Sequence, residues 1–197
     1  ALMQNIYTGE ILDFYGGIKD LKSRTIKIVD EKTFIEDSLR VLRGIRFASK
    51  FGFKIEKKSF DIMQKISLDD LSVERISKEL ELIFQTKYLE YGFFYLYKIG
   101  FFKKYFHIDV DTKTFFTIYR LLKTKKRFFK LEFYGYYMLY IINNFYKVDF
   151  SIIQSNKYEK FILKQPSLNF DISDRDLCVI ALDMPILEWL GALSNDI

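Results

Sequence analysis

The hydrophobic and polar positions of this chain follow a helical period over most of its length, but not at its start. Between residues 10 and 29, EILDFYGGIKDLKSRTIKIV, apolar runs on either side of the Gly16–Gly17 turn predict two short strands around one helical turn. Two strands alone are marginally stable, so this segment is expected to belong to a sheet. From Phe34 onward the period becomes helical. The pattern therefore predicts a boundary near residue 30.

Helices are predicted along the rest of the chain. The first runs from about Glu36 to Lys50, and Gly52 is placed to end it in the left-handed conformation. A second covers about 57–66, and Ser72 is positioned to cap a third. Further helical segments are YLEYGFFYLYKIG (88–100), TFFTIYRLLKTKK (114–126), FFKLEFYGYYMLYIINNFY (128–146) and YEKFILKQ (158–165). The expected fold class is mostly α, with a short β segment at the start.

The composition agrees with a helical protein. The chain has 197 residues, of which 49% are hydrophobic, and only 9 Gly and 2 Pro, so it has few helix breakers and can bury a sizeable core. A single cysteine, Cys178, excludes an internal disulfide and a zinc-binding set, which indicates the reducing cytoplasm. The most membrane-like run, 131–146, is too short to span a bilayer, so we expect a buried helix there and no membrane partner.

The formal net charge of +5 is unevenly distributed, which is compatible with a polyanionic partner. The stretch RLLKTKKRFFK contains six cations and no acid: Arg120, Lys123, Lys125, Lys126, Arg127 and Lys130. One interpretation is a run of solvated side chains, and the sharper one is an RNA-binding surface that contacts phosphates.

Candidate chemistry is concentrated in EDSLRVLRGIRFASKFGF, residues 36–53. Helical positions three apart lie about 60° from one another, which predicts one winding stripe of charged side chains: Asp37, Arg40, Arg43 and Arg46. The opposite side carries the apolar positions that are expected to pack inward: Val41, Leu42, Ile45 and Ala48.

A carboxylate beside a guanidinium matches particular nucleobases. The carboxylate only accepts hydrogen bonds and the guanidinium only donates them. Cytosine and adenine each present an amine beside an unprotonated ring nitrogen, so Asp37 and Arg40 can pair with both, whereas keto bases mismatch. Such bidentate pairs discriminate by about 1–3 kcal/mol, and Arg43 and Arg46 can reach a ribose or phosphates. The alternative is simple ion pairing at a helix N-terminus, worth about 0.2–0.5 kcal/mol per pair.

Three motifs follow one another over about residues 9–106. LDFYGGIKDL is similar to a DPFGGxxDL element through Asp13, Gly16 and Gly17, and VERISKEL is similar to ERIxxEL through Glu74 and Arg75. Between them, EDSLRVLRGIRFASKFGF is similar to EDPLRxLRAxRFAxxLGF. In this order the motifs resemble those of the class II (bacterial-type) tRNA nucleotidyltransferase and poly(A) polymerase family. One departure is glycine in place of the family's alanine at position 44, which should loosen the helix by up to about 1 kcal/mol.

The resemblance implies addition of C and/or A to tRNA 3′ ends, or poly(A) synthesis, from CTP and ATP with Mg²⁺. The implied nucleotide contacts, of which the first two template the base, are Asp37, Arg40, Arg43 and Arg46. The implied residues that brace the motif are Glu36, Glu74 and Arg75. The implied hinge between a catalytic head and a helical neck is Asp13, Gly16 and Gly17.

The family's paired metal-binding aspartates belong to the catalytic head, upstream of Ala1. The chain is therefore expected to contain no catalytic residue and no metal ligand, and to be inactive alone. Asp109 and Asp111 imitate that pair but follow the base-reading motif, so we expect Asp111 or Thr112 to cap the next helix instead.

The resemblance divides the chain into three parts. Residues 1–30 would end the nucleotidyltransferase head, 31–106 would form the neck with the base-reading helix, and 107–197 would form a tRNA-binding helical body and the start of a tail. The alternatives are a poly(A) polymerase of the same family, a non-catalytic helical RNA-binding module and a helical scaffold. The oligomeric state stays open.

Overall fold

The computed structural model describes residues 2–124, 134–167 and 171–183, and these are mostly helical, which confirms the expected fold class. The helices are α1 (Gly17–Lys22), α2 (Glu31–Ile35), α3 (Leu39–Phe51), α4 (Lys57–Met63), α5 (Val73–Phe84), α6 (Leu89–Lys98), α7 (Phe101–Tyr105), α8 (Thr112–Thr124), α9 (Tyr134–Phe145), α10 (Asn156–Lys164) and α11 (Asp174–Asp183). The strands are β1 (Met3–Gln4), β2 (Ile11–Leu12), β3 (Thr25–Ile26) and β4 (Lys54–Ile55).

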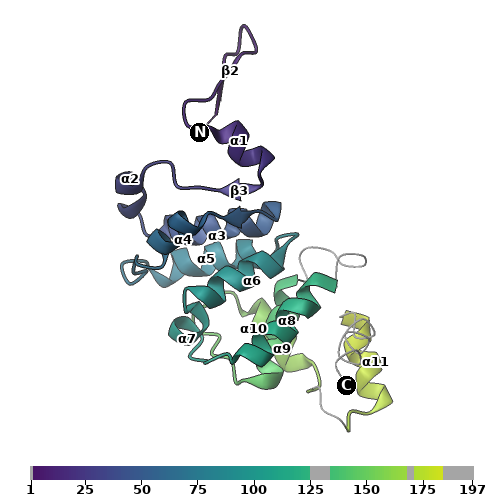
Figure 1. Ribbon diagram of the computed structural model, residues 1–197. Helices are drawn as coiled ribbons and strands as arrows, with labels where there is room; N and C mark the ends of the chain where they lie inside the picture. Colours follow the sequence, from purple (N-terminus) through teal and green to yellow (C-terminus); the bar gives the residue numbers. More distant parts are fainter. Residues whose placement is uncertain (1, 125–133, 168–170, 184–197) are drawn as a thin grey trace.

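The elements form an elongated arrangement (Figure 1). The β1–β2 hairpin and α1 lie at one end, α3 to α6 form the middle, and α7 to α10 follow beyond them. The first long helix, α3, packs against α5 and α6, and α9 packs against α5, α8 and α10. The helical middle therefore supports α3 from one side, while β3 and α1 lie across its other side.

The opening segment forms two small sheets. β1 pairs with β2 in antiparallel register, and β3 pairs with β4 in parallel, with Thr25 opposite Lys54. The predicted strands are thus present but short. Because β4 follows α3 in the chain, the β3–β4 ladder ties the opening segment to the helical part across the boundary expected near residue 30. That boundary stays a prediction.

The predicted start of the first long helix at Glu36 is wrong, because two helices occupy this region. Asp30 caps the short α2 by accepting a hydrogen bond from the Thr33 amide at 2.8 Å. Asp37 then accepts from the Leu39 amide at 3.2 Å, and α3 begins at Leu39. The predicted end is confirmed, since Gly52 has a φ of 67° and its amide donates to a carbonyl of the last turn.

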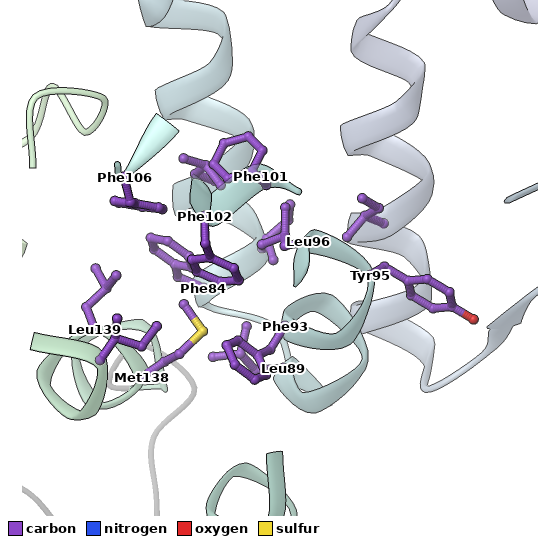
Figure 2. Packing of buried hydrophobic residues seen from close by; sticks show 14 of the residues in the cluster. Phe84, Leu89, Phe93, Tyr95, Leu96, Phe101, Phe102, Phe106, Met138 and Leu139 are labelled. Atoms are coloured by element: carbon purple, nitrogen blue, oxygen red, sulfur yellow. The ribbon is translucent and has the colours of Figure 1, made fainter. Parts of the chain in front are cut away.

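The apolar face of α3 is buried as predicted, with exposures of at most 1% at Val41, Leu42, Ile45 and Ala48. An aromatic core continues beneath it (Figure 2), where the rings of Phe93 and Phe102 lie 5.3 Å apart. Tyr95 lies apart from these rings in the same view, and its hydroxyl accepts from the Ile55 amide of β4 at 2.7 Å. This bond joins α6 to the strand that follows α3.

The run at 131–146 is a buried helix over its described part. The five residues 138–142 in the middle of α9 are each at most 2% exposed. Within the described ranges, every helix is too short or too polar to cross a membrane.

Candidate nucleic-acid interface

A cleft of about 590 Å³ lies between α3 and residues 26–34. Its α3 wall carries Arg40, Arg43, Gly44 and Phe47, whose spacing of three, four and seven residues places them on one helical face. Met63 of α4 also lines the cleft and packs closely on Gly44, where an added Cβ would lie 2.7 Å from the methionine Cε. Glycine at this position therefore lets the Met63 side chain approach the α3 backbone.

Two of the four predicted nucleotide contacts share this cleft. Arg40 donates from Nη1 to the backbone carbonyl of Thr33 in α2. Arg43 is exposed one turn further along the helix. These guanidiniums therefore lie on the wall of one cleft, with Arg40 already engaged by a protein acceptor.

The other two predicted contacts pair with α5 instead. Asp37 precedes the helix and its Oδ1 accepts from Arg75 Nη2 at 3.2 Å. Arg46 Nε lies 3.3 Å from Glu79 Oε2, and both side chains are largely buried. The prediction of one continuous helical stripe is wrong for Asp37, because α3 starts after it. Arg46 forms an ion pair with another helix, which differs from the local pairing at a helix N-terminus that the sequence offered as the alternative.

The three residues predicted to brace the motif, Glu36, Glu74 and Arg75, do not share one contact. Ser72 caps α5 as predicted and accepts from the Arg75 amide at 3.4 Å. Arg75 then reaches Asp37 through its side chain, whereas Glu74 accepts from Gln154 Nε2 at 3.0 Å. The pKa of Glu74 is lowered, first by its own backbone amide and then by Ser72. Glu36 is an exposed residue at the end of α2, and its bracing role stays a prediction.

The predicted hinge is a helix-capping turn. Asp13 accepts from the amides of Gly17 and Ile18 at 2.7 and 2.9 Å, and Gly16 adopts the left-handed conformation with a φ of 73°. The bond from Ile18 is the largest cause that lowers the pKa of Asp13. The turn therefore sets the direction of α1, and hinge motion stays a prediction.

The basic run is only partly described. Arg120 and Lys123 lie on the exposed side of α8, and Lys123 Nζ lies 4.9 Å from the centroid of the Tyr119 ring. The remaining cations of the run fall outside the described residues: Lys125, Lys126, Arg127 and Lys130. The RNA-binding role of the run stays a prediction.

Asp109 and Asp111, which imitate the family's metal-binding pair, contact other side chains in the structure. Asp111 accepts from the Thr114 amide at 3.0 Å and also from the Tyr146 hydroxyl, which confirms that it caps α8. The Thr114 hydroxyl is the first of the bonds that hold the pKa of Asp111 far below its usual value. Asp109 pairs with Lys103 at 3.1 Å. These carboxylates do not fit Mg²⁺, and no group of three or more metal-ligating side chains occurs among the described residues.

Sequence reasoning missed Phe47, which lines the cleft beside Arg43. Its spacing of four residues from Arg43 is the signal that places both on one face of α3. The helical period alone did not distinguish this exposed ring from the apolar residues that face the core.

Residues 52–108 match the family described as "Probable RNA and SrmB- binding site of polymerase A". The CCA-adding enzyme of Lactococcus lactis subsp. cremoris (strain MG1363) is 44% identical over 79 residues, which cover 38% of this chain and 20% of that protein. The multifunctional CCA protein of Pasteurella multocida (strain Pm70) is 39% identical over 107 residues, or 51% of this chain and 25% of that protein. The aligned part thus spans about a fifth to a quarter of these relatives.

Solved structures share the fold. A tRNA nucleotidyltransferase complexed with a primer tRNA and an incoming ATP analog matches 93% of this chain and 61% of its own, with a TM-score of 0.65 and 19% identity. The Thermotoga maritima CCA-adding enzyme complexed with tRNA matches 95% of this chain and 45% of its own, with a TM-score of 0.54 and 22% identity.

The helical fold, the motif-bearing α3 and these matches make this chain similar to segments of class II tRNA nucleotidyltransferases. Within that class, the curated relatives named above are CCA-adding enzymes and a multifunctional CCA protein.

Proposed function

We propose that this chain supplies base selection and RNA binding in a tRNA nucleotidyltransferase that adds C and/or A to tRNA 3′ ends. The observation that carries the proposal is the cleft on α3, which has Arg40 and Arg43 on one wall, with Asp37 just before the helix. The proposed division of labour places base reading in residues 31–106 and further tRNA contacts in the helical body.

Base reading follows from the hydrogen-bonding capacity of two side chains. Asp37 Oδ1 accepts from Arg75 and from the Leu39 amide, which orients the carboxylate and leaves Oδ2 for the amine of cytosine or adenine. Arg40 donates to the ring nitrogen after it exchanges the Thr33 carbonyl for the base. A keto base would set acceptor against acceptor, at a cost of about 1–3 kcal/mol.

Nucleotide transfer requires more than this chain's described residues provide. Mg²⁺ neutralises phosphate charge and aligns the reacting oxygens in this class of reaction. We propose that carboxylates of the catalytic head, which the family resemblance implies, bind the ion, since Asp109 pairs with Lys103 and Asp111 caps α8. The role proposed for the cleft is to hold and select the incoming CTP or ATP.

The test is incorporation by the whole protein from each of the four nucleoside triphosphates, on tRNAs that lack CCA, CA or A. Asp37→Asn keeps the shape of the side chain but adds a donor, so incorporation of U or G relative to C or A should rise about tenfold or more. The exposed Asp61→Asn on α4 is the matched control. An unchanged preference for CTP and ATP in Asp37→Asn and Arg40→Lys would refute base reading.

A non-catalytic RNA-binding module is the second candidate, favoured by the description of the family matched over 52–108. It predicts steep salt dependence of tRNA binding and no nucleotide preference. A poly(A) polymerase of the same family would instead extend the RNA by many A residues in the same assay.

A further inference from the structure

Two phenylalanines on α3 leave their rings in solvent. Phe47 is 39% exposed and Phe51 is 49% exposed. Their rings are nearly parallel, at 20°, with centroids 6.1 Å apart, and Phe53 lies 5.7 Å from Phe51. Packing of the core does not require these rings, because the buried face of the same helix is the opposite one.

The surroundings of the rings are cationic. Residues 38–55 contain five cations and neither Asp nor Glu. The Arg46 guanidinium, which also pairs with Glu79, lies 5.3 Å from the centroid of the Phe47 ring, and Lys50 Nζ lies 5.6 Å from that of Phe51. Aromatic faces between cations are the recurring means of binding single-stranded nucleic acid, because every base has a π face and every linkage carries a charge.

The rings also continue the wall of the cleft. Phe47 lines the cleft with Arg40 and Arg43, and Phe51 follows one turn later. From Arg40 to Phe51 is 11 residues, or about 16 Å along the helix axis. Bases in one strand are spaced by about 3.4 Å, so this strip matches a few consecutive unpaired nucleotides.

The far end of the strip is held rigidly. Gly52 ends α3 in the left-handed conformation, and an added Cβ there would lie 3.0 Å from the Tyr88 ring. Ser49 donates to the Tyr88 carbonyl at 3.2 Å. This end of the strip is therefore preorganised, which limits the entropy lost when a ligand binds.

We propose that Phe47 and Phe51 stack the unpaired bases at the 3′ end of the bound RNA, while Arg43 and Lys50 bind its phosphates. The strip then leads the RNA end toward the cleft where the incoming nucleotide is read. This inference rests on the proposed function, because that function names an RNA whose 3′ end must reach the cleft.

The test measures binding of this 197-residue chain to two RNA hairpins, one blunt and one with four unpaired 3′ nucleotides that include 2-aminopurine. Phe47→Leu and Phe51→Leu keep an apolar side chain but remove the aromatic face. Each should weaken binding of the hairpin with the overhang about fivefold or more, leave the blunt hairpin unaffected and reduce the quenching of 2-aminopurine. The matched control is Phe116→Leu on α8, where the ring is 52% exposed.

Salt dependence separates stacking from charge. The phenylalanine variants should keep the slope of log K against log salt, whereas Arg43→Gln should reduce it by about 0.7. Unchanged overhang binding in both phenylalanine variants, an equal loss in Phe116→Leu, or no RNA binding by the unsubstituted chain would overturn the proposal. So would a loss in this chain that disappears in the whole protein, because another part would then cover the rings.

The base-reading proposal and the stacking proposal can be refuted independently of each other. If base selection by Asp37 holds while the Phe47 and Phe51 variants bind normally, only the stacking platform is refuted. If the overhang effect holds while Asp37→Asn leaves nucleotide preference unchanged, only base reading is refuted.

Discussion

The contact between α3 and α6 depends on a glycine, and Gly92→Ala tests how closely these helices must approach. An alanine Cβ at this position would lie 2.7 Å from Ser49 Oγ and 2.9 Å from Ile83 Cγ2. Ser49 cannot easily move away, because it shares a hydrogen bond with the Thr86 hydroxyl and donates to the Tyr88 carbonyl. The helices would therefore have to separate.

The magnitude follows from two opposed effects. Overpacking of a well-packed core costs about 1–3 kcal/mol. The better helix propensity of alanine returns up to about 1 kcal/mol in α6. The free energy of unfolding should therefore fall by up to about 2 kcal/mol, which corresponds to a urea midpoint lower by up to roughly 1 M at a slope of about 2 kcal/mol/M.

The assay is urea unfolding followed by far-ultraviolet circular dichroism. Gly44→Ala on α3 is the control, because it makes the same change where the nearest atom is the flexible end of Met63, 2.7 Å away. That variant should be unchanged or up to about 1 kcal/mol more stable. A Gly92→Ala variant as stable as the Gly44→Ala variant would show that α3 and α6 are not packed as described.

Two further predictions concern buried polar groups. Glu79→Gln removes the counter-charge of Arg46, so the free energy of unfolding should fall by about 1–3 kcal/mol, and the double variant with Arg46→Gln should recover part of the loss in the same urea assay. Burial raises the pKa of Tyr140 to about 12, and its hydroxyl donates to the Pro166 carbonyl at 2.7 Å. Because the folded state keeps this proton longer than the unfolded state, the contribution is complete below about pH 10 and is lost as the pH rises toward 12. Tyr140→Phe should be less stable by about 1 kcal/mol at neutral pH and should decline less between about pH 10 and 12; an identical decline would contradict the assignment.

Local sequence signals predicted the elements that depend on neighbouring residues. Gly52 ends α3, Ser72 caps α5 and Asp111 caps α8, each through contacts within a few positions of the chain. The same signals failed at Glu36. There α2 ends at Ile35 and α3 begins only at Leu39, and the apolar period cannot reveal this break.

The candidate site likewise has one feature that the sequence predicts and another that it does not. The periodicity of residues 36–53 by itself determined which side of α3 faces the core, because burial follows the 3.6-residue repeat. Only the tertiary structure decided the partners of the charged residues. Asp37 and Arg46 pair with α5, while Arg40 and Arg43 line the cleft. The physical reason is that a charged side chain pairs with whichever group the packed helices bring within reach, and for Asp37 and Arg46 that group lies more than 30 positions away in the chain.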